Sequence, residues 1–341
     1  MIENSQPSKN KRGLYGWIGR ILIGVLALVL VFMAVVGFAG GAAKSDLAAQ
    51  NPVPGQLIDV GGYNMHIHCV GQGNPTVVME AGANDFSVTW TAVQPEIAKS
   101  TRVCTYDRAG FGWSDPSPRA RTAETMVSEL HTLLDNAEIE GPYLLVGHSF
   151  GGMIARLYTH HYPDEVVGLL LVDSPYERHS PETATLYQEM TQQTMAQLRP
   201  VVTMKSLGLL ALSPENIPDP GLSVEALAQY RAIWAATGHL DTVLVESAAM
   251  EDSFDEMRAA NITTLEDMPL VVLRHSSNPI PFFSESENIQ MELAWQLMQT
   301  DMTAQSSNGE QIVAKQSGHY IQLDQPQLVI DAVLNILDAI R

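Results

Sequence analysis

Few cysteines and few basic residues occur in this sequence, and each shortage excludes a class of protein. The 341 residues include two cysteines, Cys69 and Cys104, which are too few for a disulfide framework. We interpret them as two buried small apolar side chains, with the alternative that an exported chain oxidises the pair. Lysine and arginine number 19 against 38 aspartates and glutamates. A chain this acidic argues against nucleic acid as the main partner, because phosphate binding needs a basic face.

The positive charge is concentrated in the first 45 residues. Five basic residues and one acid there give +4, and subtracting this from the total of −19 leaves −23 for the rest of the chain. Within this segment, Ile21–Ala43 is a run of 23 residues without a charge. About 20 apolar residues suffice for a helix to span the hydrocarbon of a bilayer. We therefore predict a transmembrane helix, or uncleaved signal anchor, at residues 21–43.

The flanking residues predict the orientation of this helix. Tyr15 and Trp17 lie at its N-terminal edge, where interfacial aromatic residues are common. By the positive-inside rule, residues 1–20 form a cytoplasmic basic segment and the acidic body lies outside the cytoplasm. The alternative is a signal peptide cleaved among the small residues 39–43, which would secrete the body. Cleaved signals usually have an apolar core of only ~7–15 residues, so the length favours the anchor.

Strand and helix patterns alternate after a linker at residues 44–55. Strand patterns occur at 56–60, 64–70, 76–80, 102–106, 143–146, 167–172, 270–274 and, weakly, 311–314. Strands separated by helices predict an α/β fold with a mainly parallel, doubly wound sheet. Residues 174–267 lack a strong strand pattern and predict a helical cap inserted between core segments 56–173 and 268–341. A C-terminal helix is expected at 326–340, with Asp324 as its N-cap. Ligands of such sheets bind at the carboxyl ends of the strands.

The motif Gly147-His148-Ser149-Phe150-Gly151 lies between an expected strand and an expected helix. A strand that turns at once into a helix strains the backbone at the central serine, and the glycines let neighbouring backbone approach closely. The serine hydroxyl then projects at the edge of the sheet, above the N-terminus of a helix whose dipole favours negative charge. This pattern predicts Ser149 as a catalytic nucleophile.

Three further segments accompany this motif in the sequence. They are Met79-Glu80-Ala81-Gly82-Ala83, residues 106–114 (YDRAGFGWS) and residues 317–322 (SGHYIQ). With the serine motif, they resemble the α/β-hydrolase fold family, specifically its capped serine hydrolases, over roughly 56–341. The resemblance implies hydrolysis of an ester or related acyl bond, with no metal or organic cofactor.

A serine nucleophile needs an adjacent base, which is usually a histidine. His319 follows the last expected strand in the segment that resembles the family's catalytic loop, and we predict it as the base. His148 is expected to pack against the sheet instead. His66 and His68 share one face of a strand and could ligate a metal, but no third ligand is indicated, so a surface strand is favoured.

The acid that orients the base is harder to assign. The family's commonest position follows the expected strand 270–274, where Asn278 stands and a neutral amide cannot supply the charge. Asp173 ends the preceding strand, a position that some family members use, and we predict it as the acid. The alternative is that Asp173 is a structural carboxylate at the entry to the cap. Asp107 is expected to fasten its loop with Arg108, and Glu285 is a distant alternative acid.

The remaining predictions concern the oxyanion and the substrate. Backbone N–H groups of Phe150 and, by resemblance, Ala83 are expected to bind the oxyanion. Apolar residues of the cap favour an apolar, ester-like small-molecule substrate; they are Met190, Met195, Met204, Met250, Met257 and Trp234. Amide, lactone, thioester and carbon–carbon bond hydrolysis stay open, as does a non-catalytic ligand-binding or scaffold protein on the same fold.

Overall fold

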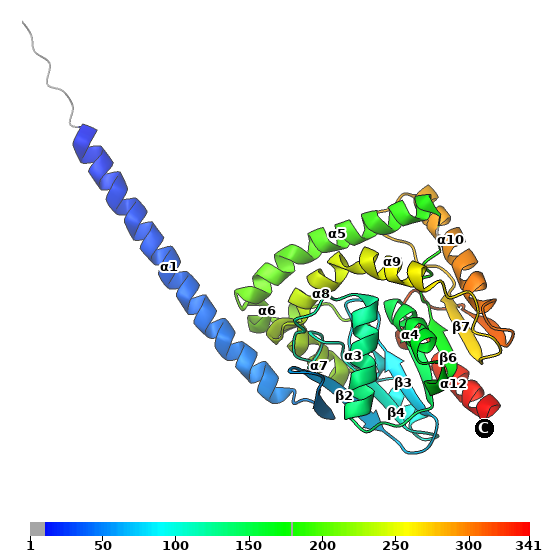
Figure 1. The fold of residues 1–341 in the computed structure, drawn as a ribbon. Helices are drawn as coiled ribbons and strands as arrows, with labels where there is room; N and C mark the ends of the chain where they lie inside the picture. Colours follow the sequence, from blue (N-terminus) through cyan, green and yellow to red (C-terminus); the bar gives the residue numbers. More distant parts are fainter. Residues whose placement is uncertain (1–10, 179) are drawn as a thin grey trace, which may run out of the picture.

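The computed structural model describes residues 11–178 and 180–341 (Figure 1). The first half of the predicted cytoplasmic segment, residues 1–10, lies outside the described residues, as does His179. The strands are β1 (Gln56–Asp59), β2 (Asn64–Val70), β3 (Thr76–Glu80), β4 (Val103–Tyr106), β5 (Tyr143–His148), β6 (Val166–Val172), β7 (Leu270–His275) and β8 (Gly309–Ala314). The helices of the core are α2 (Gln94–Ile97), α3 (Ala123–Asn136), α4 (Phe150–His161), α10 (Glu285–Thr303), α11 (Ile321–Asp324) and α12 (Pro326–Ile340).

The eight strands form one sheet in the order β1-β2-β4-β3-β5-β6-β7-β8. The pairs β1–β2 and β2–β4 are antiparallel, and all other neighbours in the sheet are parallel. Two separate apolar clusters cover the two faces, because successive side chains of a strand point to opposite sides. Leu145 of β5 packs with α3, α4 and α10, whereas Leu144 and Val146 pack with α12. The predicted α/β class, with a mainly parallel doubly wound sheet, is confirmed.

The region between β6 and β7 forms a helical layer over the sheet. Its helices are α5 (Pro181–Ser206), α6 (Leu209–Leu212), α7 (Val224–Ala236), α8 (His239–Ala248) and α9 (Met250–Ala260). Figure 1 shows α5 running across the top of this layer, from α6 at one end to α10 at the other. The sequence did not predict α10, which begins with a capping box formed by Ser284 and Glu287. Its buried face is built from Met291, Trp295, Met298 and Met302.

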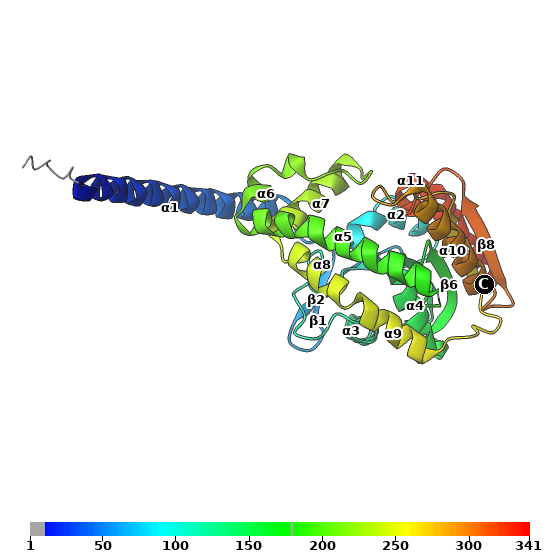
Figure 2. The ribbon, with the colours of Figure 1, turned by 90° about the horizontal axis from the view of Figure 1, so that it is seen from above.

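The N-terminal helix α1 (Lys11–Gln50) is 40 residues long. Its part from Trp17 to Gln50 is long and apolar enough to cross a membrane. The helix continues through residues 44–50, which had been expected to belong to the linker. Figure 2 shows α1 extending away from the body and meeting it beside α6. There, Gly40 of α1 touches Gly208, since a Cβ added to Gly40 would lie 2.6 Å from the Cα of Gly208.

Three local expectations were wrong. Cys69 and Cys104 form a disulfide between β2 and β4, where they are register partners, and are not free thiols. His66 is fully buried and does not lie on a surface strand. The N-cap of α12 is Gln325. Asp324 instead accepts hydrogen bonds from the Ser317 hydroxyl and the Gly318 N–H at 3.0 and 3.1 Å, which fastens the loop before His319.

Candidate active site

Ser149 lies at the sharp turn between β5 and α4. Its backbone has φ 50° and ψ −126°, a conformation that is costly for any residue other than glycine. The neighbouring glycines make the turn feasible. A Cβ on Gly147 would lie 2.5 Å from the Cα of Gly152, and a Cβ on Gly151 would lie 2.5 Å from the carbonyl oxygen of Ala81. Close packing therefore holds Ser149 at the N-terminus of α4, where the helix dipole favours developing negative charge.

Asp173 follows β6 and is the centre of a buried hydrogen-bond network. Its Oδ2 accepts from Nδ1 of His319 at 2.6 Å and from Nδ1 of His275 at 2.7 Å. Its Oδ1 accepts from the backbone N–H of His275 at 3.0 Å and from the indole N–H of Trp295 at 2.8 Å. Burial alone would raise the pKa of Asp173, but the histidine donors outweigh it and hold that pKa well below its usual range.

Ser149 and His319 line the same cavity, which has a volume of about 150 Å³. The bond from His319 Nδ1 to Asp173 leaves Nε2 as the nitrogen that can exchange a proton with a hydroxyl. The cavity is also lined by Pro175, Tyr187, Met190, His275, Asn278, Ile280, Asn288, Met291, Glu292 and Trp295. Most of this lining is apolar. Of the six cap residues predicted to line a pocket, Met190 does so, whereas Trp234 packs against Tyr230 and His239.

The loop after β3 passes close above Ser149. A Cβ on Gly82 would lie 3.2 Å from the Cβ of Ser149 and 2.7 Å from Nδ1 of His148. The guanidinium of Arg108 donates to the carbonyl oxygens of Ala81 and Gly82 at 2.7 and 2.8 Å. In a trans peptide the C=O and N–H groups point in opposite directions. Anchoring the Gly82 carbonyl to Arg108 therefore turns the N–H of Ala83 to the other side of the loop.

Arg108 also ties this loop to the cap. It forms buried ion pairs with Glu80 at 2.5 Å and with Glu246 of α8 at 3.0 Å. Burial would lower the pKa of Arg108, but the two carboxylates raise it above its usual value. Burial raises the pKa of Glu80 to about 7, against the opposing effect of Arg108. The position of the loop over Ser149 thus depends on a charge cluster shared by the core and the cap.

Sequence reasoning missed His275 and its partners. Its Nε2 lies 3.0 Å from the Glu292 carboxylate, and its Nδ1 faces Asp173. An imidazole that faces a carboxylate on both sides donates both hydrogen bonds only as the imidazolium. Burial lowers the pKa of His275, but the bond to Asp173 and the charges of both carboxylates raise it overall. The signal available in the sequence was its place at the end of β7, beside the strand that carries Asp173.

Asp173, His275 and His319 form a carboxylate–histidine cluster whose ligand atoms lie within 4.8 Å of one another. Such sets bind transition metals in other proteins. Here, however, both Nδ1 atoms lie at hydrogen-bond distance from one carboxylate oxygen, and the other oxygen already accepts two N–H groups. This geometry fits a proton-bearing network better than a cation site.

The other sequence candidates lie apart from this network or support it. His148 is buried beneath His319 and bonds to its carbonyl oxygen at 3.0 Å, and burial with the nearby His319 lowers the pKa of His148 to about 3. Asp107 fastens its loop by accepting from the N–H groups of Ser87 and Trp113, but its charged partner is His66, not Arg108. Glu285 is exposed on the first turn of α10.

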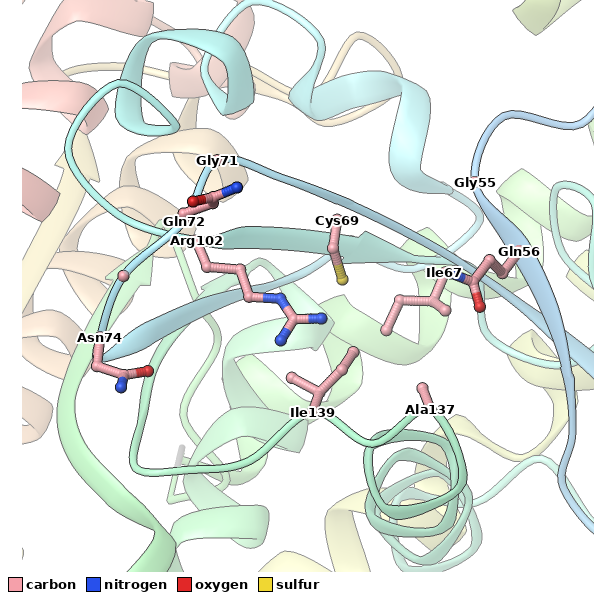
Figure 3. A pocket seen from close by; sticks show the side chains of 11 residues that line it. Gly55, Gln56, Ile67, Cys69, Gly71, Gln72, Asn74, Arg102, Ala137 and Ile139 are labelled. Carbon is pink, nitrogen blue, oxygen red and sulfur yellow. The ribbon is translucent and has the colours of Figure 1, made fainter.

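A second and larger hollow, of about 480 Å³, lies away from Ser149, near the disulfide. Figure 3 shows the side chain of Arg102 extending into it between Cys69 and Ile139. Its lining contains no second titratable side chain beside Arg102. It therefore lacks the paired groups that acid–base chemistry requires.

Comparisons with known proteins find similarity to the alpha/beta hydrolase fold. A family model described as the alpha/beta hydrolase fold matches residues 75–203. An uncharacterised protein, YqjL of Bacillus subtilis, is 26% identical over 271 residues, covering 79% of this chain and 86% of the relative. An uncharacterised vacuolar membrane protein of Saccharomyces cerevisiae is 34% identical over 134 residues, covering 34% of this chain and 21% of the relative.

Solved structures share the fold over most of the chain. The epoxide hydrolase CorEH has a TM-score of 0.61 at 20% identity, covering 84% of this chain and 99% of that one. A meta-cleavage product hydrolase from Pseudomonas fluorescens has a TM-score of 0.61 at 18% identity, covering 84% and 98%. An esterase from Thermogutta terrifontis has a TM-score of 0.58 at 21% identity, covering 84% and 98%. These likenesses concern the fold.

Proposed function

Since this chain belongs to the α/β-hydrolase fold family, we propose that it is a serine hydrolase that cleaves a carboxylic ester or related acyl bond. The observation that carries the proposal is the bond of 2.6 Å between His319 and the buried Asp173, at a cavity that Ser149 also lines. A histidine fixed by a carboxylate on one nitrogen is the base that a serine nucleophile needs.

In the proposed reaction, Ser149 Oγ attacks the acyl carbon while His319 Nε2 takes its proton. The oxyanion is held by the N–H groups of Phe150 and Ala83. Collapse of the tetrahedral intermediate breaks the bond to the leaving alcohol, which takes the proton from His319. Water then attacks the acyl-enzyme, gives a proton to His319 and releases the acid, and Ser149 recovers that proton. Asp173 stays ionised and stabilises the imidazolium that forms twice.

The cavity supports an apolar acyl or alcohol group as substrate. Methionine and tryptophan side chains line its wall, and most of the lining surface is apolar, although polar residues are also present. The serine at the turn separates this chain from family members that open epoxides with a carboxylate nucleophile. Hydrolysis of amides, lactones, thioesters or carbon–carbon bonds would use the same groups, and a non-catalytic binding protein is the alternative of another class.

We place the catalytic body outside the cytoplasm, anchored by α1. The disulfide supports this placement, because disulfides persist in oxidising compartments. The alternative location, secretion after cleavage, leaves the body on the same side of the membrane.

The test of the proposed activity is labelling of the full-length chain with a fluorophosphonate, followed by assays with p-nitrophenyl esters of increasing chain length. We expect labelling and turnover by the wild type, and loss of both in Ser149→Ala. The matched control is Ser206→Ala, which changes an exposed serine on α5. An unlabelled wild type, or equal labelling of Ser149→Ala, would show that Ser149 is not a nucleophile.

A further inference from the structure

The contact between α1 and the cap fixes the level at which the body meets a membrane. The apolar run starts at Ile21, and ~20 helical residues cross the hydrocarbon, so the far boundary lies near Gly40. Gly40 touches Gly208 at the corner between α5 and α6. One and two turns further along α1, Ala43 and Leu47 pack against the apolar cluster of the cap. The cap is therefore held at the depth where the bilayer ends.

The corner at Gly208 carries exposed apolar side chains. Met204 precedes Gly208 by four residues and Leu212 follows it by four, and they are 44% and 43% exposed. A backbone contact as close as that between the two glycines leaves these side chains beside the last turns of the apolar run. Water is a poor environment for them, whereas the bilayer interface is a favourable one.

The opposite end of α5 meets a second exposed apolar surface. Ile289, Leu293 and Leu297 form a stripe along α10 at a spacing of four residues and are 55%, 58% and 66% exposed. The stripe borders a surface groove whose other wall is the start of α5. Figure 1 shows α5 running crosswise to α1. A bilayer whose plane is perpendicular to α1 would therefore run along α5 and reach both of its ends.

The catalytic cavity lies between these two apolar surfaces. Its walls come from α5, through Tyr187 and Met190, and from α10, through Met291 and Trp295. An ester dissolved in the bilayer would meet the α5–α10 junction at the membrane face of the body. We propose that the face formed by Met204 and Leu212 of the cap and by the α10 stripe of the core rests on the lipid surface, and that the substrate is a lipophilic ester taken from that surface.

Charge decides which lipid surface fits. The body carries a net charge of −23 after residue 45, and Glu285 and Glu287 lie in the first turn of α10. Anionic headgroups would repel this face, whereas a zwitterionic surface would not. The contact is therefore apolar, and we expect its strength to depend little on ionic strength. The inference rests on the proposed hydrolase and on the proposed anchor.

The first experiment measures depth in phosphatidylcholine nanodiscs made with brominated acyl chains. Full-length variants Leu212→Cys and Ile289→Cys carry an environment-sensitive fluorophore. Leu28→Cys, within the apolar run, reports the anchor, and Asn335→Cys on α12 reports a surface away from the cap. We expect loss of emission at Leu28, Leu212 and Ile289, and none at Asn335. Loss at Leu28 alone would overturn the inference and keep the anchor, whereas no loss at Leu28 would remove the anchor itself.

The second experiment separates lipid contact from catalysis. The double variant Ile289→Glu with Leu293→Glu places charge on the stripe outside the cavity, and Asn335→Glu with Ala339→Glu adds the same charge on α12. We expect the first variant to lose turnover of a long-chain ester presented in the bilayer and to keep turnover of a short soluble ester. Equal turnover of both esters by the two variants would overturn the inference. If the wild type does not turn over the short soluble ester, the proposed hydrolase activity itself is contradicted.

Discussion

Two buried aspartate–histidine pairs lie in this molecule, and comparing them shows what makes such a pair chemically useful. The Oδ2 atom of Asp173 lies 2.6 Å from Nδ1 of His319, and the Oδ2 atom of Asp107 lies 2.9 Å from Nδ1 of His66. Both aspartates follow a strand and are fully buried. His66 is also fully buried, and its second nitrogen bonds to the carbonyl oxygen of Pro54 at 2.5 Å. Both ring nitrogens of His66 therefore have a partner, and both side chains of the pair are buried.

The pair at Asp173 differs in the exposure of its histidine. His319 keeps 24% of its side chain exposed and lines a cavity together with Ser149. The distance between carboxylate and imidazole is thus a poor guide to function. We propose that a histidine that lines a cavity together with a nucleophile distinguishes a catalytic arrangement from a structural one.

Replacing the two aspartates should give the largest contrast. Asp173→Asn removes the charge that we propose stabilises the imidazolium, and we expect kcat to fall by about 10⁴-fold, as for the same change in a serine protease. Asp107→Asn should leave kcat per folded molecule unchanged and lower the stability by ~1–3 kcal/mol, because it weakens a buried hydrogen-bonded pair. Assays with a soluble ester and thermal unfolding measure the two effects. A comparable loss of kcat in both variants would mean that the Asp107 pair also serves catalysis.

Two glycines, one packed beside Ser149 and one packed against the Asp107 pair, offer a second, smaller contrast. A Cβ on Gly82 would press on the buried ring of His148 and crowd Ser149, and Arg108 keeps the loop from moving away. Gly82→Ala should therefore lower kcat by about 10²–10³-fold, the usual effect of losing an oxyanion donor. A Cβ on Gly112 would lie 2.1 Å from the Asp107 carboxylate, at φ +51°. Gly112→Ala should cost ~1–3 kcal/mol of stability and spare kcat, measured by denaturant unfolding and initial rates.

The sequence was most informative where short motifs sit at strand ends. The strand–serine–helix pattern named Ser149, and the ends of neighbouring parallel strands meet at one edge of a sheet, which placed Asp173 and the loop of His319 nearby. It was least informative where pairing across the chain decides the outcome. Cys69 meets Cys104 only because of the register between β2 and β4, and His66 is buried beside Asp107, which comes from another loop. Local patterns in a single sequence do not predict such contacts between residues that are far apart in the chain.

The missed part of the site has the same origin. His275, Glu292 and Trp295 come from β7 and α10, and each matters because it packs around Asp173, not because of its neighbours in the sequence. The apolar residues of α10 do recur at helical spacing, from Met291 to Met302. That signal was available, but a preceding stretch with two prolines, 279–281, concealed where the helix begins.

The smallest expected effect concerns pH, and it separates the two pairs through their histidines. The pKa values of His275 and His66 are both raised, because nearby carboxylates outweigh burial. A raised pKa contributes stability that is fully present below the unfolded value of about 6.5 and is lost as the pH rises through the folded value. His275→Gln and His66→Gln should therefore both lower the melting temperature most below about pH 6.5, and less at higher pH.

Only His275→Gln should also change the pH dependence of catalysis. The imidazolium of His275 shares the Asp173 carboxylate with His319, so its removal leaves more negative charge facing the base. The acid limb of the kcat/KM profile should therefore move to higher pH, by up to about one unit. The profile of His66→Gln should match the wild type. An unmoved acid limb in His275→Gln would mean that His275 only fills space beside Asp173, and the two aspartate–histidine pairs would then differ in the cavity alone.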